Sequence, residues 1–280
     1  MMIHSSIAST LAKKIVIILG WCFIFGLHNT QAGVIQAGFN SDTLAPNDDG
    51  STGLVDIGFT TNFFGTDYTQ LFVNNNGNVT FDTVLSTFTP FDISTTNRVI
   101  IAPFFADIDT RSAGNPVTYG AGSFGGRSAF GVNWLDADYF SSSSAHTLRN
   151  FIQLILVDRS DVGAGDFDII FNYDQIQWET GNASGGSGGL GGSSARVGYS
   201  NGNTISFELD GSAVNGALLD GGNNALVSHS LNSGLDGRYI FNVRGGDVVD
   251  PPNPVPEPAS LALLGFGLIG LSFVRRRKPL

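Results

Sequence analysis

Phe151-Ile-Gln-Leu-Ile-Leu-Val157 decides the fold, because this run is almost wholly apolar and too short for a buried helix. Such a run predicts a central β-strand that is covered on both faces. The rest of the chain supplies what sheets require, with 22 Phe for packing and 37 Gly for turns. Outside its two ends, no segment keeps a helical spacing beyond a turn or two. The sequence therefore predicts an all-β fold, an antiparallel sandwich or barrel-like single domain.

Shorter apolar runs predict the strands that surround this central strand. Asn74-Asn-Asn-Gly-Asn78 separates two of them, and Asn-Gly favours a hairpin because both residues tolerate positive φ. Val99-Ile-Ile-Ala-Pro103 is predicted to be a buried strand that ends at its proline. The other expected strands are residues 34–39, 54–59, 71–73, 79–81, 129–134, 167–171, 176–178, 196–199, 205–207 and 238–243. Many short strands at this spacing are typical of a sandwich or barrel.

The largest apolar side chains on these strands are expected to form the core. They are Phe104, Trp134, Leu154, Phe171, Trp178 and Phe241. Residues 181–194 are different, because Gly and Ser dominate them. That segment is predicted to be a mobile loop, since it has almost nothing to bury.

The N-terminus carries the pattern of a secretory signal. Lys13 and Lys14 precede the apolar residues 15–27, and Thr30-Gln-Ala32 offers a cleavage site of the small-x-small type. Cleavage is expected after Ala32, and cleavage after Gly33 is the alternative. The only cysteine, Cys22, lies within this signal, so the mature chain would have no disulfide and would depend on a buried core.

The C-terminus has three parts in a fixed order. Val255-Pro-Glu-Pro-Ala259 is held rigid by its prolines. Residues 259–274 are apolar or small, and as a helix they would be about 24 Å long. That is slightly short for a permanent membrane span, which needs about 20 residues. Arg275-Arg-Arg-Lys278 follows, and such a cluster stays on the cytoplasmic face. The bulk of the protein would then lie on the other side.

This tail closely resembles the PEP-CTERM sorting signal of Gram-negative bacteria. The motif positions are occupied by Pro256, Glu257, Pro258, Arg275, Arg276 and Arg277. The resemblance implies that an exosortase in the inner membrane recognises and processes the tail. The mature protein would then reach the cell surface or the exopolysaccharide matrix. The alternative is an ordinary C-terminal anchor helix with a basic stop.

A second resemblance lies within the β-rich region. Ile100-Ile-Ala-Pro-Phe-Phe-Ala-Asp-Ile-Asp-Thr-Arg111 resembles the opening signature of the nidogen-like (NIDO) extracellular domain, with Phe105 in place of the usual tryptophan. Further blocks follow the family's order over about residues 68–245: 133–134, 151–156, 168–173, 176–178, 197–200 and 237–241. The resemblance implies a β-rich extracellular module associated with cell–matrix adhesion. The family has no known catalytic residues to carry over.

Four regions follow from these observations. Residues 1–32 are expected to be the signal peptide and 33–245 the β-rich domain. Residues 246–255 form a Gly- and Pro-rich linker, and 256–280 form the sorting signal with its transmembrane segment at 259–274.

The charge of the mature region restricts its partners. Residues 33–258 hold eight arginines and all 24 acidic residues, a formal charge of −16. Such a surface repels nucleic acid and anionic lipid, and it favours divalent cations, neutral sugars or basic partners. Solubility alone is an equally good explanation of the charge.

The chain offers little that predicts catalysis or a cofactor. Gly-rich matches to a nucleophile elbow and a dinucleotide loop both fall within residues 185–191, where no strand-to-helix unit surrounds them. His146 and His229 are the only histidines of the mature region, and neither has the spacing of a zinc site. No cofactor is expected, apart from one calcium hypothesis.

Two acidic clusters suit a hard cation such as calcium. Asp107 and Asp109 alternate with Arg111, which would place all three on one strand face. The second cluster consists of Asp158, Asp161, Asp166 and Asp168. The calcium hypothesis is assigned to Asp107 and Asp109. The competing interpretation is a set of solvated carboxylates, with Asp107 and Asp109 paired with Arg111, whose charge would compete with a metal ion.

The functional hypothesis is an exported surface or biofilm-matrix protein whose NIDO-like domain mediates adhesion. Its expected partners are exosortase, exopolysaccharide and surface or matrix proteins, and it is not expected to be an enzyme. Two alternatives stay open. A secreted hydrolase acting on the exopolysaccharide would need two carboxylates roughly 5–10 Å apart in a cleft. A structural matrix protein would need no specific ligand.

Overall fold

The computed structural model describes residues 33–111, 114–141 and 147–249, all within the second of two compact units. The predicted signal peptide, sorting motif and transmembrane segment lie outside these residues. None of the described residues forms a helix of the length and apolarity that a membrane crossing requires. The strands are β1 (Asp42–Thr43), β2 (Val55–Phe63), β3 (Thr66–Asn74), β4 (Asn78–Thr80), β5 (Val99–Phe105), β6 (Thr118–Phe124), β7 (Arg127–Ala137), β8 (Asn150–Asp158), β9 (Phe167–Ile176), β10 (Arg196–Asn201), β11 (Ser206–Glu208), β12 (Arg238–Arg244) and β13 (Asp247–Val249).

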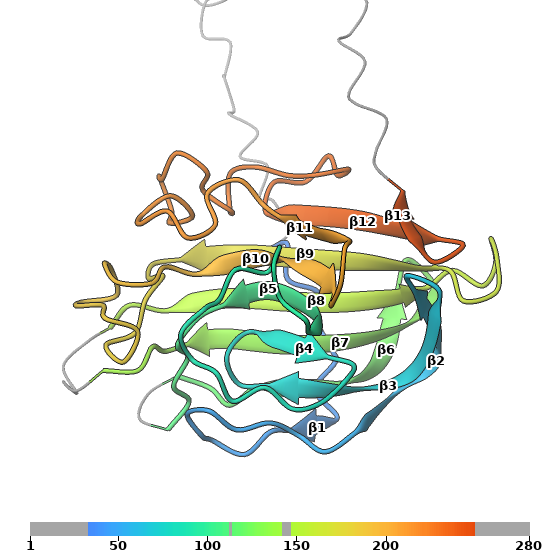
Figure 1. Cartoon of the computed structure of the whole chain (residues 1–280), viewed down its shortest axis with the longest axis horizontal. Helices are drawn as coiled ribbons and strands as arrows, with labels where there is room; N and C mark the ends of the chain where they lie inside the picture. Colours follow the sequence, from blue (N-terminus) through green and yellow to red (C-terminus); the bar gives the residue numbers. More distant parts are fainter. Residues whose placement is uncertain (1–32, 112–113, 142–146, 250–280) are drawn as a thin grey trace, which may run out of the picture. The chain divides into compact units, whose positions relative to one another are not determined.

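The strands form two antiparallel sheets, which confirms the all-β prediction (Figure 1). The larger sheet has the order β1-β6-β7-β8-β9-β12-β13, and the smaller sheet has the order β11-β10-β5-β4-β3-β2. The apolar run 151–157 lies in β8, the middle strand of the larger sheet, as its composition predicts.

The main core lies between the two sheets. From β8, Ile152, Leu154 and Leu156 belong to this core, while Ile155 and Val157 belong to a second cluster on the opposite face of the strand. This alternation is the period of two that a strand imposes. The side chains predicted for the core are all buried: Phe104, Trp134, Leu154, Phe171, Trp178 and Phe241.

The outer face of the larger sheet is covered by residues 33–40, where the sequence predicted a strand. This segment forms no ladder, and side-chain amides hold it instead. Gln36 N donates to Gln153 Oε1 at 3.0 Å, and Asn133 Nδ2 donates to the Phe39 carbonyl at 2.9 Å. Phe39 packs so closely on Gly131 that a Cβ there would lie 2.3 Å from the Phe39 ring. The apolar residues of this segment therefore serve as a cover rather than as a strand.

The hairpin between β3 and β4 confirms the Asn-Gly prediction. Gly77 has φ +72°, and a Cβ on it would lie 1.7 Å from the Phe104 carbonyl oxygen, so only glycine fits. Asn75 and Asn76 are fully buried. The side-chain Nδ2 of Asn75 donates a hydrogen bond to the Ile108 carbonyl oxygen. The backbone carbonyl oxygen of Asn75 accepts a hydrogen bond from Trp134 Nε1 at 3.0 Å. The hairpin therefore ties both sheets together.

The sequence predicted that this strand ends at Pro103, but β5 continues to Phe105. The proline is tolerated because the pairing of β5 with β10 shifts register between Arg196 and Gly198, opposite this position. Phe104 then joins the main core, and Phe105 packs on the other face of the sheet.

Residues 181–194 do not match the expectation that they bury almost nothing. Ser184 and Ser194 are 6% and 3% exposed. The segment bonds to itself and to the chain before it, with Ser193 N donating to Ser184 O at 2.9 Å and Glu179 N to Gly189 O at 2.8 Å. Glycines at positive φ allow these tight turns, so backbone hydrogen bonds replace the missing apolar side chains.

Candidate functional site

An acidic cluster lies beside the Asn-rich hairpin. Asp107 lies two residues after the end of β5, whereas Asp48 and Asp49 belong to the loop between β1 and β2. Each residue offers one carboxylate oxygen, and the three oxygens lie within 4.8 Å of one another. Asp107 is only 1% exposed. The cluster is therefore a concentration of negative charge at a largely buried position.

The hairpin and the Gly-rich segment position these carboxylates. Asn76 Nδ2 donates to Asp49 Oδ1 at 2.9 Å. Ser184 N donates to Asp107 Oδ2 at 3.2 Å, and a Cβ on Gly181 would lie 2.3 Å from that same oxygen. The backbone at 181–184 therefore covers Asp107 closely.

The electrostatics of the cluster favour binding of a positive species. Burial, and then the charge of Asp48, raise the pKa of Asp107 to about 7. Burial, and then Asp109 and Asp49, raise the pKa of Asp48 to about 6, while Arg111 acts in the opposite direction. A bound proton or a hard cation would each relieve this repulsion.

Asp109 pairs with Arg111, the arrangement of the competing interpretation, and lies outside the Asp48–Asp49–Asp107 group. Arg111 donates from Nε to Asp109 Oδ1 and from Nη2 to Asp109 Oδ2, both at 2.9 Å. The same Nη2 also donates to Asp48 Oδ2 at 2.9 Å. The guanidinium thus engages both oxygens of Asp109. Asp107 groups with Asp48 and Asp49, because the chain leaves the regular strand after Phe105 and simple alternation no longer applies.

The second predicted acidic cluster lies where β8 turns into β9. Arginines neutralise much of it: Asp168 binds Arg159 at 2.8 Å and Arg244 at 2.6 Å, and Asp161 binds Arg127 at 2.9 Å. Asp158 accepts a hydrogen bond from Ser160 N, and Asp166 accepts one from Gly245 N. This turn is therefore a network of ion pairs and backbone hydrogen bonds.

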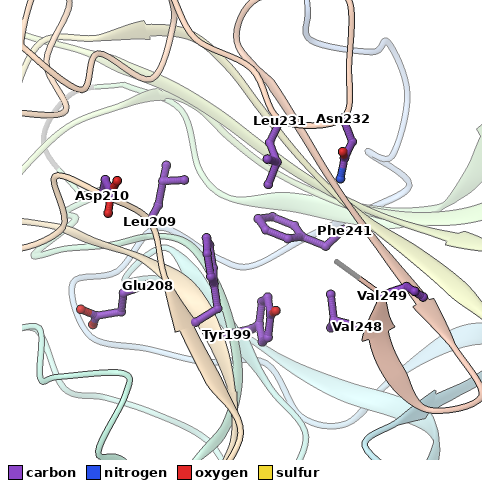
Figure 2. Close-up of a pocket in the computed structure, with 10 residues that line it drawn as sticks. Tyr199, Glu208, Leu209, Asp210, Leu231, Asn232, Phe241, Val248 and Val249 are labelled. Atoms are coloured by element: carbon purple, nitrogen blue, oxygen red, sulfur yellow. The ribbon is translucent and has the colours of Figure 1, made fainter. Parts of the chain in front are cut away.

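A cavity of about 300 Å³ opens between β11, at the edge of the smaller sheet, and β12–β13, at the edge of the larger one (Figure 2). Its aromatic wall consists of Tyr199, Phe207 and Phe241, whose ring centroids lie 5.4–5.5 Å apart. Val248 and Val249 also line the cavity, and Val249 is 47% exposed. We call this cavity the edge pocket.

Two carboxylates lie at the rim of the edge pocket. Glu208 is paired with Arg196, whose Nη1 lies 2.8 Å from both carboxylate oxygens, and it also accepts a hydrogen bond from Ile93 N. Asp210 is exposed, and no described residue forms a hydrogen bond or ion pair with it. A second cavity of about 170 Å³ shares Leu209, Asp210 and Leu231 with the edge pocket. Asp210 thus lies between two adjoining hollows.

Comparison with known proteins identifies the domain. A model of the nidogen-like domain matches residues 69–245, most of the two-sheet structure. The chain belongs to the nidogen-like domain family. The PEP-CTERM protein-sorting motif matches residues 254–278, which include Pro256, Glu257, Pro258 and Arg275 to Arg277. The nidogen-like protein is therefore an exported extracellular or cell-surface protein that is sorted by exosortase.

The curated relatives of this nidogen-like protein include alpha-tectorins. The mouse protein is 32% identical over 259 residues, and the human protein is 31% identical over the same length; each alignment covers 82% of this chain. The chicken protein is 30% identical over 251 residues, or 80% of this chain. This chain spans about a tenth of the length of those relatives (11% of each). No solved structure matches.

Sequence reasoning located the nidogen-like domain but missed parts of its sites. Asp48 and Asp49 lie about 60 residues before Asp107, and their only local signal is the turn sequence Asp-Asp-Gly at 48–50. The edge pocket is assembled from residues 199–210, 231–241 and 248–249. None of these segments carries a binding motif by itself.

Proposed function

We propose that this protein is an adhesion module of the bacterial surface or biofilm matrix, delivered by exosortase. The observation that carries the proposal is a nidogen-like domain and a PEP-CTERM motif in one chain, at 69–245 and 254–278. The domain supplies a rigid scaffold, and the edge pocket supplies a concave apolar surface for a partner. In this function the protein binds and performs no chemistry.

The hydrolase alternative has less support. Glycoside hydrolysis needs two carboxylates roughly 5–10 Å apart with a sugar between them. The Asp48–Asp49–Asp107 oxygens lie within 4.8 Å of one another, and the backbone at 181–184 covers Asp107. Of the two carboxylates at the rim of the edge pocket, Glu208 is already engaged by Arg196 and Ile93 N. A non-specific structural role also has less support, because it would leave the edge pocket without a purpose.

Binding of the purified mature protein to washed matrix of the producing bacterium tests the proposal. We expect saturable retention that excess unlabelled protein displaces. The control is a non-binding protein of similar size and net charge, because a charge of −16 alone alters retention. Retention equal to that of the control would contradict the adhesion proposal.

A further inference from the structure

The edge pocket has the chemistry of a site for a sugar ring. Sugar rings present C–H groups on their faces and hydroxyl groups around their edges. Aromatic rings offer electron-rich faces that attract C–H groups weakly. The edge pocket combines such a wall, formed by Tyr199, Phe207 and Phe241, with carboxylates at its rim. Carboxylates accept hydrogen bonds and donate none, which suits hydroxyl donors.

The charge around the edge pocket selects among polysaccharides. The negative charge of Glu208 is already balanced by Arg196, and its carboxylate also accepts a hydrogen bond from Ile93 N. The pocket therefore lacks the concentrated negative charge that a cation site needs. Asp210 places an exposed carboxylate at the rim, which would repel an acidic sugar. The net charge of −16 over residues 33–258 adds long-range repulsion of anionic polymers. A neutral polysaccharide fits these constraints best.

The second cavity extends the site in the way that a polymer requires. It adjoins the edge pocket through Leu209, Asp210 and Leu231, and it continues towards His229 and Tyr239. The two hollows, of about 300 and 170 Å³, would hold neighbouring sugar units. Asp210 lies where both units could donate a hydroxyl hydrogen bond to its carboxylate.

We infer that the edge pocket and the adjoining cavity bind a neutral polysaccharide, with one sugar ring against the aromatic wall and Asp210 accepting hydroxyl hydrogen bonds. This inference rests on the proposed adhesion function and gives its partner a chemical class. Phe207 and Asp210 are the residues to change, because one is only half-buried on an edge strand and the other is exposed.

The test uses polysaccharide from the producing bacterium's own matrix, separated by anion exchange into neutral and acidic fractions. Affinity of the mature protein for each fraction is measured before and after the paired substitutions Phe207→Leu and Asp210→Ala. The matched control pair is Val162→Ser and Asp56→Ala, which alters one exposed apolar residue and one exposed acid that line neither cavity. Asp56 lies on β2, at the opposite edge of the smaller sheet from β11. Thermal unfolding verifies that both pairs stay folded.

We expect the unchanged protein to bind the neutral fraction. The Phe207/Asp210 pair should weaken binding about tenfold, through one lost ring contact and one lost charged hydrogen bond, while the control pair binds as before. Preference for the acidic fraction would overturn the inference, and so would equal binding by the Phe207/Asp210 pair. If that pair is still retained by whole matrix as the unchanged protein is, the adhesion function stands and the polysaccharide assignment fails. If the unchanged protein is not retained by whole matrix, the adhesion function itself fails.

Discussion

At the scale of single residues, Asp107 belongs to the nidogen-like block at residues 100–111 and is a buried carboxylate beside two other carboxylates. Its carboxylate lies almost wholly out of water, next to Asp48 and beneath the backbone of residues 181–184. A charged group in this position is costly unless a positive species compensates it. The site should therefore respond both to protons and to cations.

The first prediction concerns the pH dependence of stability. Asp107 and Asp48 have folded-state pKa values of about 7 and about 6, above the ordinary 3.8. The folded state therefore holds more protons than the unfolded state between these pKa values, and the free energy of unfolding falls as pH rises.

Chemical denaturation should give a larger free energy of unfolding at about pH 5 than at about pH 8. Asp107→Asn should reduce this slope, whereas Asp236→Asn, on an exposed acid, should not. A slope unchanged by Asp107→Asn would contradict the assignment.

The calcium hypothesis stays a prediction, with a changed set of ligands. Asp48, Asp49 and Asp107 converge, whereas Arg111 occupies both oxygens of Asp109. We expect millimolar Ca²⁺ to raise the thermal midpoint, by an amount equivalent to about 2.7 kcal/mol at a hundredfold excess over Kd. The rise should be larger at about pH 8 than at about pH 5, because protons compete for the same oxygens.

The variants distinguish the two ligand sets. The double substitution Asp48→Asn with Asp107→Asn should abolish the Ca²⁺-induced rise in the thermal midpoint. Asp109→Asn should leave that rise unchanged. A midpoint indifferent to both Ca²⁺ and EDTA would rule the calcium site out.

At the scale of elements, the sandwich is stabilised where strand ends and loops pack together. Trp178 lies just after β9 and is fully buried. Its ring meets Phe104 edge-on at 5.7 Å, and its Nε1 donates to Ala137 O at 3.0 Å. One side chain thus links β9, β5 and β7.

Trp178→Ala should therefore lower the free energy of unfolding by about 3–5 kcal/mol, the usual cost of removing a large buried aromatic side chain. Equilibrium denaturation measures the change. Leu190→Ala is the matched control, because Leu190 is nearby in sequence but 36% exposed. An unchanged unfolding midpoint for Trp178→Ala would mean that the ring adds nothing to the core.

Most strands predicted from sequence carry apolar side chains of the core, such as β8 and β12. The exception is the apolar run 34–39, which covers the larger sheet without forming a strand. β6 (Thr118–Phe124) was missed, because Gly120 and Gly122 resemble turn residues. These glycines instead provide a flat surface for the covering segment: a Cβ on Gly122 would lie 2.7 Å from the Phe39 ring. In the sequence, a glycine that allows close packing on a strand cannot be distinguished from a glycine in a turn, so this strand was missed. The acidic cluster and the edge pocket join distant segments, so they required the three-dimensional structure.

At the scale of the whole molecule, the residues that the structure describes begin at Gly33, directly after the predicted cleavage site. Val34 is 4% exposed, and its carbonyl accepts a hydrogen bond from Arg238 Nη2 at 2.9 Å. Cleavage after Ala32 would leave this covering segment intact. The PEP-CTERM motif follows the sandwich at residue 254.

We predict that the mature protein begins at Gly33 and lacks Arg275 to Leu280, because signal peptidase and exosortase act on the two ends. Intact-mass measurement of native protein from the envelope or matrix reads both ends at once. Protein isolated from a strain without exosortase provides the control and should retain the basic terminus. A main form that keeps Arg275 to Leu280 in the normal strain would contradict the processing prediction.

If the proposed adhesion function is correct, the exported nidogen-like domain holds cells to their matrix. The shear needed to detach a biofilm of the producing bacterium tests it most directly, comparing the normal strain, a strain without this protein and that strain with the protein restored. The account predicts detachment at lower shear without the protein and recovery when the protein is restored. Equal shear in all three strains, with the restored protein present at its normal level, would contradict it.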